Sequence, residues 1–313
     1  MTLRAQNVSV TLPVGQAVEH VGRMLFRPFQ LEKWLAIGFC AWLAHLGQQG
    51  FRGSYGGGGR HGNVDVQQWV QRARGYVLNN LYWIVPVAIG VVVLGLALWV
   101  LIAWVSSRGK FMFLHCVARD SAEVAAPWHN FAREASSLFW FRLALGGVQL
   151  LSILVLGTGI GALVWNLVHR GASVGNIGGM VLLGGVFLLI CVVIALIAKL
   201  TTDFVVPMLF LRGGTCLEGW EILRGLLVGN LGGFVLYILF QILLSLAIGA
   251  SVLAVVLVTC CIAGCLLVIP YIGTVLFLPV LVFQRSYSIF YLRQYGPDYD
   301  VFSPSPGPAS TLP

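Results

Sequence analysis

The sequence predicts an all-α protein, a polytopic bundle of about six transmembrane helices. Hydrophobic residues make up 58% of the 313-residue chain and charged residues only 10%, whereas soluble domains average roughly 45–50% and 25%. Uncharged apolar runs recur along the whole length, and a bilayer core of ~30 Å requires about 20 helical residues. We therefore expect one integral membrane domain over residues 1–298.

Six uncharged runs define the expected spans. The first is short, and to cross a bilayer it would have to extend back toward Leu25 or lie partly in the interface. The last two belong to one uncharged stretch that is too long for a single span, so we expect a reversal between Cys260 and Gly273, where glycine and proline break the helix. The expected spans are Trp34–Leu46, Leu81–Val105, Leu138–Val168, Met180–Ala198, Leu231–Leu257 and Leu266–Tyr287.

The distribution of basic residues predicts that both termini are cytoplasmic. Fourteen of the 19 Lys and Arg residues lie before span 1, between spans 2 and 3, between spans 4 and 5, or after span 6. Cytoplasmic segments retain positive charge during insertion, so this side is the inside. The net charge of +8 follows from this topology. The basic residues form no patch or tail typical of nucleic-acid binding.

Two polar segments lie outside the expected spans. Residues 48–80 form an outer loop that begins with the glycine-rich FRGSYGGGGRHG, which is typical of a flexible connector. The second half of this loop carries apolar residues at helical spacing between Val66 and Leu78, which predicts an amphipathic helix on the outer leaflet. Residues 299–313 include the Pro/Ser-rich SPSPGPASTLP and are expected to form a disordered cytoplasmic tail.

Three cytoplasmic segments share a pattern that suggests an internal repeat. Met24–Trp34, Phe113–Trp128 and Met208–Trp220 each run from apolar residues through an Arg and an acidic residue to a Trp. We interpret them as interfacial helices, anchored by Trp34, Trp128 and Trp220, that each introduce a helical hairpin. Coincidence is the alternative, because apolar segments with Arg, Glu and Trp near an interface resemble one another easily.

Four polar residues within or beside the spans are the candidate sites, because polar groups in a bilayer are costly. Gln149 and Gln241 each follow a repeat Trp by 21 residues and could bind a solute or bond between helices. Lys199 and Asp203 are four residues apart, a spacing that permits a local ion pair. A proton or ion relay would need further partners, such as Arg285 or Arg142.

No motif in the sequence identifies a catalytic, cofactor or metal site. The histidines lack HExxH or HxH spacing, the GxSxG pattern of a serine nucleophile does not occur, and the GGGG run lacks the ending of a phosphate loop. The seven cysteines lack CxxC pairs and are expected to pack as small apolar residues. We therefore predict no catalytic residue, cofactor or metal, and an enzyme is the less favoured hypothesis.

Two stretches carry a resemblance to known proteins. WLAIGFCAWLAHLGQQG, followed by the glycine-rich loop, and FQRSYSIFYLRQYGPDYDVF resemble an uncharacterised family of bacterial multi-span membrane proteins. The hairpin pattern is also similar to the membrane domain attached to some glycerophosphodiester phosphodiesterases, although no phosphodiesterase catalytic domain is present. The resemblance implies the bacterial inner (plasma) membrane as the location.

Two hypotheses about function follow from the sequence. The first is a non-enzymatic protein that scaffolds partners or responds to lipids, with membrane lipids, other proteins or a second copy of the chain as partners and no nucleic acid. The second is a transporter or lipid-handling protein with a polar site between the third, fourth and fifth spans, formed by Gln149, Gln241, Lys199 and Asp203.

Overall fold

A computed structural model describes residues 9–46, 80–171, 173–259, 264 and 269–303. Within these residues the regular structure is helical, and no strand occurs. The all-α prediction is therefore confirmed for this part of the chain. The predicted outer loop, apart from Asn80, and the Pro/Ser-rich end of the tail lie outside it.

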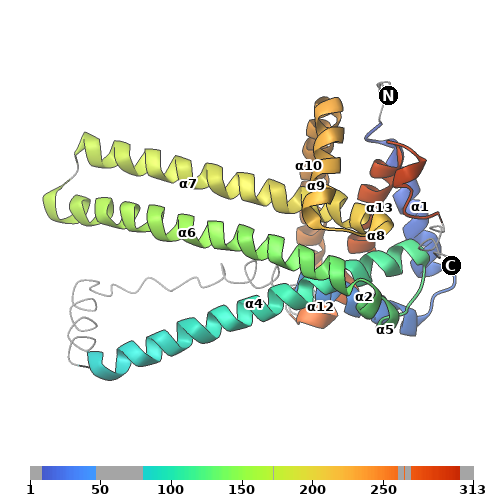
Figure 1. Cartoon of the computed structure of the whole chain (residues 1–313), viewed down its shortest axis with the longest axis horizontal. Coiled ribbons are helices and arrows are strands. Elements are labelled where there is room, and N and C mark those ends of the chain that lie inside the picture. Colours follow the sequence, from blue (N-terminus) through green and yellow to red (C-terminus); the bar gives the residue numbers. More distant parts are fainter. Residues whose placement is uncertain (1–8, 47–79, 172, 260–263, 265–268, 304–313) are drawn as a thin grey trace, which may run out of the picture.

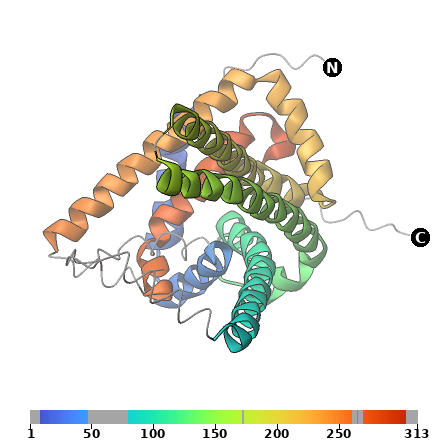
Figure 2. The same cartoon turned by 90° about the vertical axis from the view of Figure 1, so that its left-hand side faces the viewer.

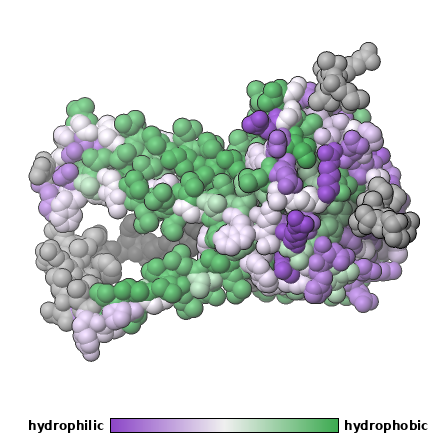
Figure 3. Space-filling model, viewed as in Figure 1, coloured by the Kyte–Doolittle hydropathy of each residue, from purple (hydrophilic) through white to green (hydrophobic). Residues whose placement is uncertain are grey.

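Three long helices extend from a compact helical base (Figure 1). They are α4 (Leu81–Arg119), α6 (Ala132–Arg170) and α7 (Val174–Leu200). At 1.5 Å per residue the 39-residue α4 and α6 are each ~58 Å long, well beyond the ~30 Å of a bilayer core. Their surface is apolar between a polar tip and a polar base (Figure 3), as expected for helices that cross a membrane.

Four helical segments are long and apolar enough to cross a membrane among the described residues: Tyr82–Arg119, Ala132–His169, Val174–Arg212 and Leu231–Val258. They correspond to the second to fifth predicted spans. The protein is therefore a membrane protein by the length and composition of its helices.

The first and last predicted spans are shorter helices in the structure. α2 (Leu31–His45) has 15 residues, and the last run is divided at Phe277 into α12 (Pro270–Leu276) and α13 (Leu278–Arg293). Each is shorter than the ~20 residues that a bilayer core requires. Many of their apolar side chains are buried within the base, so an apolar run here forms protein core as well as surface.

Helix α10 (Leu231–Val258) leaves the base in a different direction from α4, α6 and α7 (Figures 1 and 2). Only its first turns are packed, where Phe234, Tyr237 and Gln241 are buried. Most of the remaining side chains are exposed apolar residues. The base therefore holds α10 by one end.

The core of the base forms between the ends of the long helices opposite their tips and several shorter helices. These are α1 (Leu12–Phe26), α2, α5 (Ala125–Asn130), α8 (Val206–Arg212), α9 (Cys216–Gly229), α12, α13 and the 3-10 turn η2 (Pro297–Tyr299). α1 packs on α13, and the two ends of the described chain are tied together there. The backbone N–H of Ser9 donates to Oε1 of Gln294 at 2.9 Å, and Nε2 of Gln294 donates to the Ser9 carbonyl at 2.9 Å.

The beginning of the predicted tail is packed against this base. Val301 is fully buried, Phe302 stacks on Phe290 with ring centroids 4.6 Å apart, and Arg119 donates to the Ser303 carbonyl at 3.2 Å. These apolar side chains precede the Pro/Ser-rich segment whose composition predicted disorder. The chain is thus ordered five residues into the segment that we expected to be disordered.

Helices α2 and α4 approach each other closely at Gly109. A Cβ added there would lie 2.6 Å from the backbone of Leu43 and of Ala44 in α2. Nearby, the buried thiols of Cys40 and Cys116 lie with their sulfur atoms 3.7 Å apart. This contact agrees with the expectation that the cysteines are small packing residues. Cys260, Cys261 and Cys265 lie outside the described part of the chain.

We expect Gly109→Ala to destabilise the base, because the neighbouring atoms belong to backbone and cannot move aside. Overpacking of this kind costs about 1–3 kcal/mol. Gly95→Ala is the matched control, since the same helix offers open space there. Thermal unfolding of both variants in the same detergent measures the difference. Equal melting temperatures would show that α2 and α4 are not in close contact.

His20 joins α1 to the end of α4 and predicts a pH dependence. Its Nε2 donates to the Val117 carbonyl at 3.0 Å, and its ring lies edge-on to Phe302, 5.0 Å away. Burial lowers the pKa of His20 below its usual value of 6.5. The folded protein therefore binds fewer protons than the unfolded chain below about pH 6.5, and stability falls as the pH drops through that range.

His20→Gln retains a donor for the Val117 carbonyl but does not titrate. We expect this variant to show a flatter dependence of melting temperature on pH between about 5 and 7. His169→Gln is the control, because that imidazole is exposed and lies on the distal end of α6. An unchanged slope in the His20 variant would mean that His20 is protonated equally in both states.

Candidate functional site

The helix that follows α7 contains an irregular turn rich in polar residues. Between α7 and α8, the residues Thr201–Val205 form a π-helix, η1. A π-helical turn widens the helix and occurs often at functional sites. Asp203, at its centre, is only 8% exposed. The turn therefore places a carboxylate inside the base.

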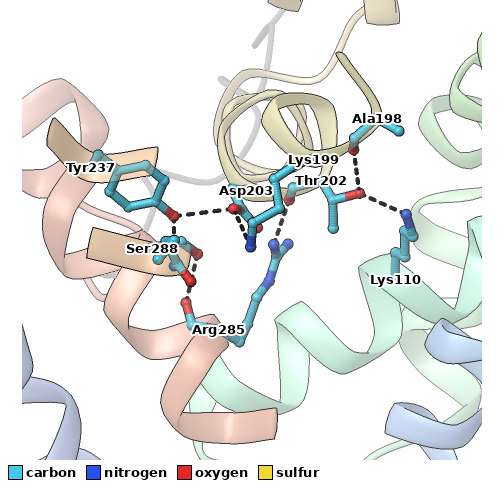
Figure 4. Close-up of polar contacts among 9 residues, drawn as sticks. Lys110, Ala198, Lys199, Thr202, Asp203, Tyr237, Arg285 and Ser288 are labelled. Carbon is cyan, nitrogen blue, oxygen red and sulfur yellow. Dashed lines mark hydrogen bonds and ion pairs between the residues drawn. The ribbon is translucent and has the colours of Figure 1, made fainter. Parts of the chain in front are cut away.

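Asp203 is bound from two helices (Figure 4). Its Oδ2 lies 2.9 Å from Nζ of Lys199, one turn earlier, and accepts a hydrogen bond of 3.1 Å from the hydroxyl of Tyr237 on α10. Nε2 of Gln241 donates to the same Tyr237 oxygen at 3.0 Å. The first turns of α10 are thus connected to η1 through a chain of buried polar groups.

Thr202 connects η1 to two further helices. Nζ of Lys110, on α4, donates to Oγ1 of Thr202 at 2.7 Å, and Arg285, on α13, donates to the Thr202 carbonyl (Figure 4). Both cationic side chains belong to residues that are only 7% exposed. Residues far apart in the sequence therefore meet on two consecutive positions of one turn.

A fourth cation, Arg142 of α6, lies beside this network. Its Nη1 donates to the hydroxyls of Ser106 and Ser107 on α4, at 3.2 and 3.1 Å. We call Lys110, Arg142, Lys199, Asp203 and Arg285 the charge cluster. It contains four basic groups and one acidic group.

Two polar atoms in and beside the charge cluster lack hydrogen-bond partners within the described part of the chain and are available to a ligand. Among the described residues, Nη2 of Arg285 and Oε1 of Gln241 are buried without a hydrogen-bond partner. Buried polar atoms are normally paired, so each such atom needs an explanation. The side chain of Lys199 is 45% exposed and connects the charge cluster to the surface. An anion that reached this side chain would find more positive than negative charge behind it.

The structure brings together three of the four residues that the sequence singled out. Lys199, Asp203 and Gln241 belong to one network, whereas Gln149 is half-buried and donates to the sulfur of Cys191 at 3.4 Å. Cys191 precedes Lys199 by two helical turns, about 12 Å along α7. Arg142 and Arg285 take part as partners. Lys110 and Tyr237 were missed, although the apolar run FMFL directly after Lys110 was a usable signal that this lysine lies within a helix and not in a loop.

The three repeat tryptophans are all half-buried but have different partners. Nε1 of Trp34 donates to the Leu25 carbonyl at 2.8 Å, and Nε1 of Trp220 donates to Oγ1 of Thr201 at 3.1 Å. The ring of Trp128 lies near Arg108. In each segment one helix ends and a second helix, carrying the Trp, begins a few residues later. Whether the segments are copies of one unit stays a prediction.

The comparison with protein families assigns the chain to a family. A model described as a family of unknown function, DUF7544, matches residues 9–276. The chain belongs to DUF7544. No curated protein and no solved structure matches it. The matched region of this DUF7544 member includes four residues of the charge cluster and ends before the fifth, Arg285.

The chemistry of the site is electrostatic. Within the described part of this DUF7544 protein, no group of three or more His, Cys, Asp or Glu residues is arranged to hold a metal ion. The charge cluster instead offers guanidinium and ammonium groups, which bind carboxylate and phosphate oxygens through charge-assisted hydrogen bonds.

We expect Asp203→Asn to destabilise the protein by about 3 kcal/mol. The substitution removes the one carboxylate of the charge cluster, and breaking a buried ion pair costs roughly 3–5 kcal/mol, with the lower end expected for a partly exposed lysine. Glu19→Gln is the control, because its pair with Arg23 is exposed and should contribute less than about 1 kcal/mol. Chemical denaturation in detergent compares the variants.

The double variant Asp203→Asn/Lys199→Gln should recover part of this loss, since it removes one of the uncompensated positive charges. Wild-type stability in the single variant would contradict a structural role for the carboxylate. A double variant no more stable than Asp203→Asn would show that the loss comes from the hydrogen bonds and not from the charge.

Proposed function

We propose that this DUF7544 protein is a non-enzymatic membrane protein that responds to anionic phospholipids through its charge cluster. The observation that carries the proposal is the excess of basic groups around Asp203, at the level where the apolar helices enter the polar base. A phosphate or carboxylate oxygen of a lipid headgroup would supply the missing negative charge. Lys199, the exposed member, is placed to make the first contact.

The proposal includes the orientation of the protein. We propose that the base lies on the cytoplasmic side of a bacterial inner membrane, with both termini there. The basic residues of the predicted cytoplasmic segments, such as Arg23, Lys33 and Arg212, belong to the base. Positive charge is typical of cytoplasmic segments and is attracted by the anionic lipids of that leaflet.

The number of crossings is also part of the proposal. In a six-span topology, α2 and the α12–α13 pair would supply the first and last crossings, and the three Trp segments would each introduce a hairpin. Connectivity supports a crossing before α4, because α2 belongs to the base whereas α4 begins at the distal tip (Figure 1). An even number of crossings keeps both termini on one side.

A lipid-handling or transport function is the second candidate. It is favoured by the unpaired acceptor of Gln241, which lies beside the hydroxyl of Tyr237 and so extends the polar network into the first turns of α10. Gln149 lies apart from the other three residues, which weakens the hypothesis that Gln149, Gln241, Lys199 and Asp203 form one polar site. The resemblance to membrane domains of some glycerophosphodiester phosphodiesterases is compatible with either function and supplies no activity.

Reconstitution of the full chain into nanodiscs tests the proposed function. We expect the melting temperature to be higher in phosphatidylcholine mixed with phosphatidylglycerol than in phosphatidylcholine alone, because a ligand that binds the folded state stabilises it. Lys199→Gln should reduce this difference, since one basic residue near an anionic surface contributes about 1 kcal/mol.

Arg23→Gln is the control for the loss of one positive charge, because Arg23 is exposed in the base and lies outside the charge cluster. The proposed function is wrong if phosphatidylglycerol leaves the wild-type melting temperature unchanged. It is also wrong if Arg23→Gln and Lys199→Gln reduce the difference equally, because the response would then depend on total charge.

A further inference from the structure

A second cationic group lies at the foot of α4, apart from the charge cluster. The guanidinium carbon of Arg108 is 4.7 Å from the ring centroid of Trp104 and 5.0 Å from that of Trp128. The two indole rings meet edge to face, with centroids 6.0 Å apart. Aromatic faces attract a cation through their quadrupole, so the two rings fix the position of the guanidinium.

Arg108 uses few of its five N–H donors in hydrogen bonds with the described residues. Its Nη1 donates to the Trp128 carbonyl at 3.4 Å, and no acidic partner contacts it among the described residues. Arg108 is only half-buried. The planar fork of guanidinium donors is suited to phosphate oxygens. A positioned, partly exposed arginine without a carboxylate is therefore available to an anion.

An apolar groove adjoins this arginine. It has a volume of about 480 Å³ and lies between α4 and α6, lined by Leu96, Ala97, Val100, Leu101, Trp104 and Phe139. Trp104 belongs both to the groove and to the pair of rings around Arg108. Because α4 runs from the tip to the base, the groove extends about 12 Å from Leu96 to Trp104, and Arg108 follows one turn closer to the base.

The groove and the arginine together match one kind of molecule. A glycerophospholipid has an apolar chain that lies along the membrane normal and a phosphate at the level of the interface. The groove lining is apolar, and Arg108 lies next to it, where α4 contacts Trp128 of the base. A partner helix with a diameter of 10–12 Å would occupy roughly twice the groove volume over the same length.

We infer that the α4–α6 groove binds one acyl chain of an anionic glycerophospholipid and that Arg108 binds its phosphate. The inference rests on the proposed function and deepens it, because it gives the lipid a second contact distinct from the charge cluster. Trp104 has two roles in this site: one face of its ring supports Arg108, and the indole closes the base-side end of the groove.

Photocrosslinking tests the site. The full chain is reconstituted into vesicles that contain phosphatidylglycerol or phosphatidylcholine, each with the same diazirine-bearing acyl chain, and labelled peptides are identified by mass spectrometry. We expect labelling between Leu96 and Leu101, and more of it from phosphatidylglycerol. Ala97→Phe, which fills the groove, should abolish this labelling. Ala88→Phe is the matched control, an exposed alanine about two and a half turns earlier on α4.

The arginine is tested in the same vesicles. Arg108→Gln should reduce the preference for phosphatidylglycerol about fivefold, which corresponds to the ~1 kcal/mol of one basic residue at an anionic surface. Arg224→Gln, at an exposed position of α9, is the control. Equal labelling by the two lipids, or a preference that survives Arg108→Gln, overturns the inference, as does labelling that survives Ala97→Phe.

The outcomes separate the inference from the proposed function. If phosphatidylglycerol stabilises the wild type through Lys199 but does not label the groove, the inference is wrong and the proposed function stands. If the groove is labelled through Arg108 while Lys199→Gln changes nothing, the site is supported and the charge cluster is not the lipid contact. Melting temperatures and size-exclusion profiles of each variant show that the fold is retained.

Discussion

The contacts of the π-helical turn η1 hold the apolar helices on the base. Thr202 and Asp203 bind groups from α4, α10 and α13, while the turn itself continues α7. Such a junction is costly, because taking charges out of water is repaid only when geometry and hydrogen bonding are good. In this turn two consecutive residues contact different helices. The hydrogen bond between Asp203 and Tyr237 is the one that positions α10.

Aromatic side chains surround this junction and strengthen its interactions. Tyr237 lies within 4.6 Å of Tyr291 and 5.7 Å of Tyr287, ring centroid to centroid, and Phe204 lies 4.9 Å from Tyr237. All four rings are fully buried. In a region of low dielectric constant, a hydrogen bond is stronger and an unpaired charge is more costly. The same environment therefore strengthens the interactions of Asp203 with Tyr237 and Lys199 and makes the excess of basic groups more costly.

The lipid-binding proposals share one physical basis. Both place an incompletely compensated cation where an apolar surface meets a polar base, which is the level of a lipid headgroup. The charge cluster lies where α7 and α10 join the base, and Arg108 lies where α4 joins it. For a family of unknown function, this arrangement identifies membrane lipids as the first partners to test.

The sequence by itself determined the features that depend on local order. Apolar composition predicted a membrane protein, uncharged runs located α4, α6, α7 and α10, and the spacing of Lys199 and Asp203 predicted an ion pair that the structure contains. These predictions succeed because helical periodicity places residues four apart on one face. The same reasoning could not show that the apolar runs of α2, α12 and α13 also contribute buried side chains to the base.

Only the tertiary structure decided which distant residues meet. Lys110 and Arg285 reach Thr202 across 92 and 83 positions of sequence, and Tyr237 reaches Asp203 across 34. No local pattern encodes such separations, because they depend on how several helices pack in three dimensions. For the same reason Gln149 and Gln241, matched in sequence, have different partners: Gln149 bonds to Cys191 of the neighbouring α7, whereas Gln241 bonds to Tyr237 of its own helix, whose hydroxyl reaches Asp203.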